Sequence, residues 1–323
     1  MLPGVGIFGT GVLARATVHF LKESGFKIVA VWSRTLAEAK KFATELAIPF
    51  STNRADDLLL KSEVGFVVIA CTPHLQSPIA VKALGIGKHV IASWPAGTSQ
   101  LEVLKMVKAA TYYPSLLSMM CHGIRFLPSY IMMKEKVEEG LIGEVYLFEI
   151  RVHSQAGFSE YDWRCDGMMG GGALSIHGSY IIDTVSYLSG KNIKSVNGMV
   201  KTYVKTTQTV NGVREITGDD FCSFQMILDG GVTVSCTINN LCEGESLHEV
   251  IVVGSKGRLI AKDLDLYVRL SDHVGKESCL HEGCKDDTNN ALSDSASQRA
   301  PFFKGKCHCT YLTFTYLCTY LGL

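Results

Sequence analysis

The sequence lacks a surplus of charge of either sign. Its 323 residues include 31 Lys and Arg against 31 Asp and Glu. A balanced chain has no overall electrostatic attraction to nucleic acid or to an acidic membrane surface, and the sequence shows no local patch that would supply one. Composition therefore favours small molecules as partners and argues against nucleic acid.

Long hydrophobic runs and the cysteine spacing of a zinc site are also lacking. No apolar run reaches the ~18 to 20 residues that a membrane span requires. The N-terminal MLPGVGIFGTGVLA has no basic start, so we interpret it as a first strand and its turn, with a secretory signal as the alternative. The 11 cysteines are odd in number, and pairs such as Cys307 and Cys309 lack the doubled spacing of a zinc site. We expect a reducing, cytoplasmic compartment and no metal.

Two patterns of hydrophobic periodicity follow one another along the chain. The first 118 residues alternate strand-like runs (5–8, 28–32, 66–71 and 90–92) with helical segments (13–23, 36–46, 79–84 and 101–110). Strands alternating with helices predict right-handed βαβ units and a parallel sheet. From about residue 145, strand-like runs follow one another between turn signals such as Gly230-Gly231, which predicts an antiparallel sheet.

The predicted fold class is therefore α/β, with a Rossmann-type doubly wound parallel sheet over residues 1–118. An α+β domain with a mainly antiparallel open sheet is expected over residues 119–268. Residues 269–323 form an atypical tail. Its first part is polar and without period, which predicts a loop or disorder, and its end alternates Thr, Tyr, Leu and Cys with almost no charge.

A dinucleotide fingerprint follows the first predicted strand. Gly9, Thr10, Gly11, Val12, Leu13 and Ala14 have the G-x-G-x-x-A pattern. The first glycine permits a tight turn, the second lets a pyrophosphate approach the backbone, and the small alanine lets the helix pack on the sheet. The helix that follows offers free N–H groups and a positive dipole end to phosphate. The alternative is a Gly-rich turn that binds nothing.

The end of the second predicted strand bears on the choice of coenzyme. An acidic residue there would bind a ribose 2′-hydroxyl, but the chain reads Trp32-Ser33-Arg34-Thr35. With no carboxylate to repel it, a 2′-phosphate can take the Ser33 hydroxyl and the Arg34 guanidinium. We therefore predict NADP in preference to NAD. The alternative is that Ser33 or Thr35 caps the next helix and Arg34 is solvated.

A set of motifs resembles the Gfo/Idh/MocA oxidoreductases. These are FGTGVLA, CTPHLQSPIAVKALGIGKHV, RFLP, DWR and GGGALSIHGSYIID, and MLPGVGIFGTG and GDDFCSFQM are most similar to a vertebrate group within that family, the glucose-fructose oxidoreductase domain-containing proteins. The resemblance implies a Rossmann domain followed by a domain whose open sheet often forms a homo-oligomer interface. It also implies hydride transfer between NAD(P) and a carbon of a sugar or polyol.

The chain departs from the family at the positions that carry the chemistry. The family's fourth strand ends in Glu-Lys-Pro, in which the lysine stabilises a developing alkoxide, whereas this chain has Ser93, Trp94 and Pro95. An indole donates one hydrogen bond but supplies no charge, and electrostatic stabilisation of the reacting oxygen is usually a large contribution. Trp94 is thus expected to fill a vacated catalytic position.

A second family motif, G-G-G-x-L-x-D-x-G-x-H-x-x-D, is altered in the same sense. Ile176 stands where the family has the aspartate, and Tyr180 stands where it has the histidine. A tyrosine also occurs there in some branches, and a phenol can act as a general acid, so Tyr180 is the candidate catalytic residue. His177 is one residue from the aspartate position, which turns a helical side chain by about 100°, so we expect it to be structural. Asp183 is expected to pair locally or face solvent.

Six further residues are candidates near the cofactor or the substrate cleft, and four of them, Arg125, Trp163, Arg164 and His122, match family positions. Arg125, Trp163 and Arg164 are candidates for the cleft, although an Arg beside aromatic rings is as often a cation–π packing element. His122 either replaces an amide contact to the nicotinamide or caps a strand. Thr72 and Pro73 follow the third predicted strand, where Thr can touch the cofactor and Pro suits a helix start.

Two functions follow from these residues. The favoured one is an NADP-binding pseudo-oxidoreductase with weak or lost hydride transfer and a scaffolding or nucleotide-sensing role. The alternative is an active NAD(P)-dependent oxidoreductase that acts on a sugar or polyol, with Tyr180 as the acid and His122 or His177 assisting. An empty nucleotide loop, hence a purely structural module, is the third possibility.

Overall fold

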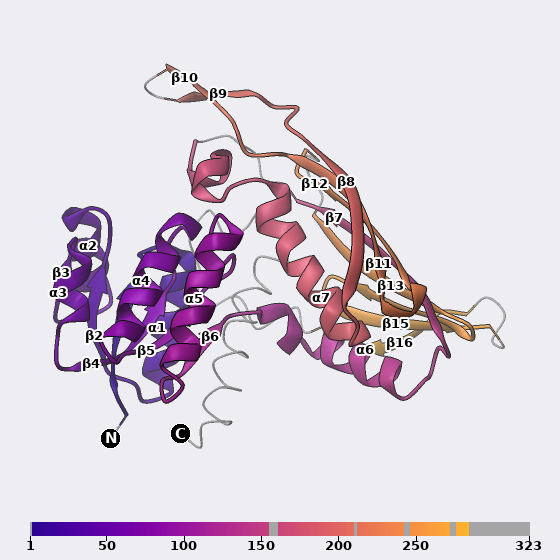
Figure 1. The fold of residues 1–323 in the computed structure, drawn as a ribbon, viewed down its shortest axis with the longest axis horizontal. Coiled ribbons are helices and arrows are strands. Elements are labelled where there is room, and N and C mark those ends of the chain that lie inside the picture. Colours follow the sequence, from indigo (N-terminus) through magenta and orange to yellow (C-terminus); the bar gives the residue numbers. More distant parts are fainter. Residues whose placement is uncertain (1, 155–160, 210–211, 242–245, 272–275, 284–323) are drawn as a thin grey trace. The chain divides into compact units, whose positions relative to one another are not determined.

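The computed structural model describes residues 2–154, 161–209, 212–241, 246–271 and 276–283 (Figure 1). Contacts divide the chain into two compact units between His122 and Gly123, and each unit is described by itself. The predictions for the end of the tail, including Cys307 and Cys309, lie outside the described residues.

The first unit is built on a six-stranded parallel sheet with the strand order β3-β2-β1-β4-β5-β6. The order changes direction at β1, which pairs β2 on one side and β4 on the other. Its strands are β1 (Gly4–Phe8), β2 (Ile28–Trp32), β3 (Ser51–Thr52), β4 (Val64–Ile69), β5 (His89–Ala92) and β6 (Ser118–Met120). Its helices are α1 (Val12–Glu23), α2 (Leu36–Glu45), α3 (Ala55–Leu59), α4 (Pro73–Gly85) and α5 (Gln100–Tyr112).

Helices cover both faces of this sheet because successive strand residues point to opposite sides. Ile7 of β1 belongs to a buried cluster that includes α1 and α2 residues such as Leu21 and Phe42. The next residue, Phe8, belongs to a second cluster with α3 and α4 residues such as Leu58 and Ala83. A doubly wound sheet is the result, and its strands read as continuous apolar runs for the same reason.

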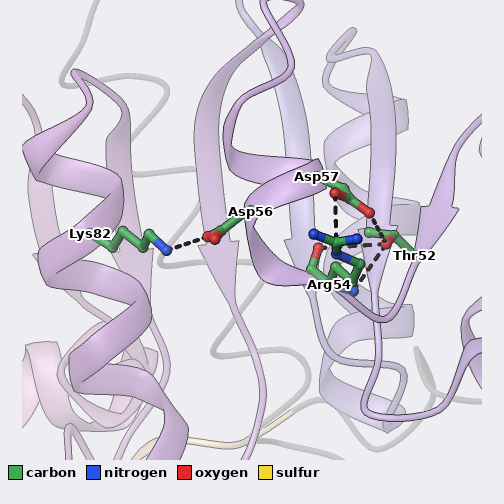
Figure 2. Close-up of polar contacts among 5 residues, drawn as sticks. All are labelled: Thr52, Arg54, Asp56, Asp57 and Lys82. Carbon is green, nitrogen blue, oxygen red and sulfur yellow. Dashed lines mark hydrogen bonds and ion pairs between the residues drawn. The ribbon is translucent and has the colours of Figure 1, made fainter.

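The connection between α2 and β4 contains elements that periodicity did not predict. The two-residue β3 and the five-residue α3 are too short to show a hydrophobic period. Polar contacts fix them instead (Figure 2): the Thr52 hydroxyl donates to Asp57 Oδ2 at 3.1 Å and accepts from Arg54 N at 3.0 Å. An ion pair between Asp56 and Lys82 joins α3 to α4.

The second unit is built on an eight-stranded sheet with the order β16-β15-β14-β13-β7-β12-β11-β8. Only the pairing of β7 with β12 is parallel within this sheet. The predicted fold class is thus confirmed: a parallel Rossmann sheet is followed by a mainly antiparallel sheet. The strands are β7 (Val145–His153), β8 (Ile193–Lys201), β11 (Phe221–Leu228), β12 (Thr233–Asn239), β13 (Leu247–Gly254), β14 (Gly257–Lys262), β15 (Asp265–Leu270) and β16 (Ser278–His281), and a separate hairpin joins β9 (Thr206–Thr209) to β10 (Gly212–Glu215).

Two helices, α6 (Pro128–Glu138) and α7 (Ser179–Ser189), lie against one face of this sheet (Figure 1). Burial alternates along the strands accordingly: Phe148 and Ile150 of β7 are buried, whereas Glu149 and Arg151 are exposed. The strand β16 was not predicted, because the segment after residue 268 is polar. It pairs with β15 at the edge of the sheet, with Val268 opposite Ser278.

Candidate functional site

The turn between β1 and α1 has the backbone that the fingerprint predicts. Gly9 has φ +122°, and a Cβ there would lie 2.3 Å from the carbonyl oxygen of Ala70, which directly follows the neighbouring strand β4. Gly11 is the N-cap of α1, and no atom lies within 4 Å of the position of an added Cβ. The first glycine is therefore required by the fold, whereas the second keeps open the space in front of the helix.

The start of α1 suits a phosphate group. No side chain caps this helix, no acidic residue stands in its first turn, and Val12 is 50% exposed there. Thr10 and Leu13 are half-buried on either side. Free N–H groups, the positive end of the helix dipole and an approachable Gly11 together fit the pyrophosphate of a dinucleotide.

At the end of β2 the structure places a carboxylate that sequence reasoning missed. Ser33 is buried, and its hydroxyl donates to Oε2 of Glu38 at 2.8 Å, while Thr10 Oγ1 lies 3.4 Å from the same hydroxyl. Glu38 belongs to the first turn of α2, and its backbone N–H donates to Oγ1 of Thr35, the N-cap. The prediction of NADP assumed that no carboxylate stands here, and that premise is wrong.

Arg34 is exposed beside this group, toward the end of β4. Burial raises the pKa of the Cys71 thiol to about 12, and the positive charge of Arg34 acts in the opposite direction. The guanidinium is therefore close enough to β4 for its charge to act there. Among the described residues it has no ion-pair partner, so it is available to an anionic ligand.

The carboxyl ends of β4, β5 and β6 bring together the next group of predicted residues. Thr72 is the N-cap of α4 and Pro73 its first residue, and the buried Thr72 hydroxyl has no hydrogen-bond partner in the described part of the chain. Ser93 is buried and accepts a hydrogen bond from Gln76 Nε2 at 3.2 Å. In folds of this kind, ligands bind at the edge formed by the carboxyl ends of the parallel strands, which is where these polar groups lie.

Trp94 and His122 form a ring pair at this edge. Their centroids are 4.4 Å apart, with the planes inclined by 47°. The Trp94–Pro95 peptide bond is cis. The indole offers one N–H donor and no charge, so Trp94, which the resemblance matches to a lysine of the family, packs on a neighbouring ring and supplies no cation.

Tyr180 lies in a buried cluster of the second unit. Its hydroxyl is 3.1 Å from Nδ1 of His177, and both side chains are buried. Its ring is 5.7 Å from that of His248, which shares a 2.9 Å hydrogen bond with the hydroxyl of Tyr130. Burial, followed by the charge of Tyr130, raises the pKa of Tyr180 well above its usual value of 10.

The segment before α7 is a π-helix, Leu174–Gly178. The expectation that one residue turns a side chain by about 100° assumed α-helical geometry, which does not hold here, because a π-helix has more residues per turn. His177 points into the buried cluster, and Ile176 is half-buried. The Gly-rich opening has a partner in the GDD motif: Asp219 accepts the Leu174 N–H at 2.8 Å.

The charged candidates of the second unit have partners within that unit, distant in sequence for Arg125 and close in sequence for Arg164. Arg125 makes a bidentate pair with Asp183, with Nε to Oδ2 at 2.8 Å, and lies 5.2 Å from the ring centre of Tyr187. Arg164 pairs with Asp162, and Trp163 stands beside it in the same short 3₁₀ turn. The sequence left both a clamp and a packing role open for Arg125, and both contacts observed here, to Asp183 and to Tyr187, are with α7.

The described residues contain neither a membrane-crossing helix nor a cluster of metal ligands. No helix in that part of the chain combines the length and apolar character that crossing a membrane requires. No group of three or more His, Cys, Asp or Glu side chains there stands together in a way that would hold a metal ion.

Two family models together match most of the chain. Residues 4–120 match an oxidoreductase family with an NAD-binding Rossmann fold, and residues 130–260 match the GFO/IDH/MocA C-terminal domain. Glucose-fructose oxidoreductase domain-containing protein 1 of Xenopus tropicalis is 45% identical over 305 residues, which cover 93% of this chain and 77% of that protein. The human protein 2 of the same group is 43% identical over 283 residues, covering 87% and 73%.

Solved structures share the fold at lower identity. Levoglucosan dehydrogenase in complex with NADH and levoglucosan has a TM-score of 0.80 at 20% identity, and the match covers 96% of this chain and 89% of that one. An oxidoreductase domain protein from Kribbella flavida has a TM-score of 0.78 at 22% identity, covering 86% and 79%. The predicted resemblance is confirmed, and the chain belongs to the GFO/IDH/MocA family of oxidoreductases, with the vertebrate glucose-fructose oxidoreductase domain-containing proteins among its relatives.

Proposed function

We propose that the chain binds a nicotinamide dinucleotide with its pyrophosphate at Gly11 and the start of α1. The open space at Gly11 and the uncapped helix support this, and the buried Thr72 hydroxyl offers a polar contact at the next strand. When bound, the nicotinamide would supply the hydride acceptor or donor. Ser93, Trp94 and His122 would then lie along its reactive end, because they follow β5 and β6 at the same sheet edge.

We further propose that hydride transfer is weak or lost in this chain, which makes it a pseudo-oxidoreductase with a scaffolding or nucleotide-sensing role. The observation that carries this proposal is the Trp94–His122 ring pair at the end of β5. A neutral indole cannot offset the negative charge of a developing alkoxide, whereas a fixed cation can. A general acid or base typically contributes ~10²- to 10⁴-fold, and Ile176 cannot serve as either.

Cofactor content and turnover test the two halves of this proposal separately. Denatured protein should release NAD(P)(H), detected by absorbance and mass, and Gly11→Val should bind it at least ~100-fold more weakly because a side chain fills the open space. A clean blank together with no binding in titration would refute the cofactor proposal. Assays with a panel of sugars and polyols should show no turnover above that of Gly11→Val.

An active oxidoreductase on a sugar or polyol is the second candidate. The observation in its favour is the hydrogen bond between Tyr180 and His177, since an imidazole beside a phenol can take up its proton. The raised pKa of the buried Tyr180 argues against it, because that phenol gives up a proton less readily. Turnover that disappears in Tyr180→Phe and persists in Tyr146→Phe, a change at an exposed tyrosine, would establish this candidate.

We propose that the second unit self-associates through the open face of its sheet. Half-buried apolar side chains such as Ile251 and Val253 stand there among exposed charged ones such as Glu149. Light scattering should report more than one chain per particle, and Ile251→Glu should reduce the mass to that of a monomer.

The compartment that we propose for the chain is reducing and cytoplasmic. The six cysteines in the described part of the chain are free thiols, which supports this proposal.

Arg34 and Ser33 differ in whether they support NADP, which carries a phosphate at the ribose 2′-position, as the coenzyme. The exposed guanidinium of Arg34 supports the predicted NADP, as a charged donor for phosphate oxygens. The Ser33 hydroxyl no longer supports it, because its proton is already donated to Glu38.

A further inference from the structure

Glu38 lies in the first turn of α2 and contacts Ser33, the residue that follows β2. The Gly9 N–H donates to the carbonyl of Trp32 at 2.9 Å, so the nucleotide loop and the end of β2 are joined directly. In Rossmann folds, residues at the end of the second strand recognise the ribose 2′-hydroxyl of NAD or the 2′-phosphate of NADP. The Glu38 carboxylate reaches the same end from α2, through the hydroxyl of Ser33.

A chain of polar groups fixes this carboxylate beside the loop. Thr10 Oγ1 lies 3.4 Å from Ser33 Oγ, and Ser33 donates to Glu38 Oε2 at 2.8 Å. Ser33 is 5% exposed, so solvent gives its hydroxyl few other partners. A hydroxyl has one proton, and here that proton goes to the carboxylate. Glu38 Oε1 has no hydrogen bond to any described residue and remains available as an acceptor.

These contacts suit a ribose diol better than a ribose phosphate. A 2′-hydroxyl can donate to a carboxylate oxygen, which is a charge-assisted hydrogen bond. A 2′-phosphate has acceptor oxygens and a charge of about −1.5 to −2, so it would be repelled by Glu38 and would find the Ser33 proton already used. Arg34 attracts a phosphate and Glu38 repels it, and because both side chains are exposed, solvent and salt screen both charges. The difference between the two coenzymes then rests on the buried Ser33 hydroxyl, whose proton is donated to Glu38.

We propose that Glu38 is a specificity-determining residue that accepts a hydrogen bond from the ribose 2′-hydroxyl, so that the chain prefers NAD(H) to NADP(H). The proposal rests on the proposed function, because it assumes that a dinucleotide occupies the Gly11 loop. It reverses the coenzyme preference that the residues Ser33 and Arg34 predict from sequence. It concerns binding and is independent of whether any hydride is transferred.

Fluorescence titration with NADH and NADPH tests the proposal on the full chain. The quantity to compare is the ratio of the two dissociation constants. Wild type should bind NADH at least about tenfold more tightly than NADPH. Glu38→Gln keeps an oxygen that can accept the Ser33 proton but removes the charge, so the ratio should move by about tenfold toward NADPH. Glu38→Lys should move it further, past equality.

Matched variants separate this effect from a general loss of charge or fold. Glu45→Gln makes the same change at the other end of α2, in a carboxylate paired with Arg15, and should leave the ratio within twofold of wild type. Arg34→Ala should weaken NADPH more than NADH. Unchanged thermal unfolding of each variant would confirm that the fold is retained.

The outcomes distinguish the inference from the proposed function. A wild type that prefers NADPH, or a ratio that Glu38→Gln moves no more than Glu45→Gln does, would overturn the role of Glu38 and leave dinucleotide binding intact. Failure of both coenzymes to bind the wild type would overturn the proposed function and this inference with it.

Discussion

Replacement of Tyr180 by Phe separates a structural role of its hydroxyl from a catalytic one. The phenol is 6% exposed and its oxygen is 3.1 Å from Nδ1 of His177, which is 3% exposed. The change removes one oxygen atom and leaves the ring in place, so no cavity larger than that atom forms. Any decrease in the free energy of unfolding is therefore due to the lost hydrogen bond and to the polar groups around the hydroxyl.

The magnitude follows from the burial of both partners. A net intramolecular hydrogen bond contributes about 1 kcal/mol, and a buried group that loses its partner costs about 1–3 kcal/mol. We expect Tyr180→Phe to lower the free energy of unfolding by about 2 kcal/mol. For a unit of this size that corresponds to a fall in Tm of about 4–8 °C.

Urea unfolding followed by tryptophan fluorescence, together with calorimetry, measures this loss. Tyr146→Phe, at a 51% exposed position of the same unit, is the control and should change the free energy by less than about 0.5 kcal/mol. NADH affinity should be unaffected in both variants. The structural role is refuted if Tyr180→Phe unfolds like wild type while a sugar or polyol turnover measured in wild type disappears.

Three other changes test the backbone, the ion pair and the buried thiols. Gly9→Ala should cost about 2–4 kcal/mol of unfolding free energy and abolish dinucleotide binding, because its φ is +122° and the new Cβ would meet the Ala70 carbonyl; a variant that melts like wild type would contradict this. Asp183→Asn should cost about 0.5–1.5 kcal/mol in urea unfolding, less at high salt, since its partner Arg125 is partly exposed; a cost that salt does not change would argue against an ion pair. Burial raises the pKa of Cys222 to about 12 from its usual 9.0, so the folded state holds this proton more tightly than the unfolded state. The contribution of this thiol to the free energy of unfolding should be complete below pH 9 and fall between pH 9 and 12, by up to about 1.4 kcal/mol per pH unit. Urea unfolding at several pH values should show that the free energy of unfolding falls less steeply in Cys222→Ala than in wild type. An equal slope in both would exclude this thiol as the cause.

The fold was predictable where local pattern and global structure agree. The run of residues 145–153 coincides with β7, and the Gly9 to Ala14 fingerprint lies between β1 and α1 as its spacing requires. A period of two or of 3.6 residues marks such elements because one side of each is buried. The short β3 and the polar β16 carry no such period, so pairing with a neighbouring strand alone defines them.

The site was less predictable, because its contacts join residues that are distant in sequence. The pair of Arg125 with Asp183 spans 58 positions, and the sequence contains no signal for it. The position of Glu38 could have been predicted from the sequence. Thr35-x-x-Glu38 is a helix-start pattern, which predicts that the carboxylate lies close to the end of β2. The pattern normally directs that carboxylate to the backbone of the cap, whereas here it accepts from Ser33 instead.

The proposed binding of the coenzyme and the proposed loss of hydride transfer depend on different groups of the chain. Phosphate recognition at the β1–α1 turn uses backbone N–H groups, which no side-chain substitution elsewhere removes, and its geometry depends on Gly9 and Gly11. Under the proposed function, charge stabilisation at the end of β5 would depend on a single side chain, and the indole of Trp94 carries no charge. Loss of chemistry with retention of the coenzyme is therefore the easier change. It predicts that Trp94→Lys, measured by NADH titration beside wild type, alters coenzyme affinity by less than about tenfold. A collapse of binding in that variant would show that the ring pair, and not the loop alone, holds the dinucleotide.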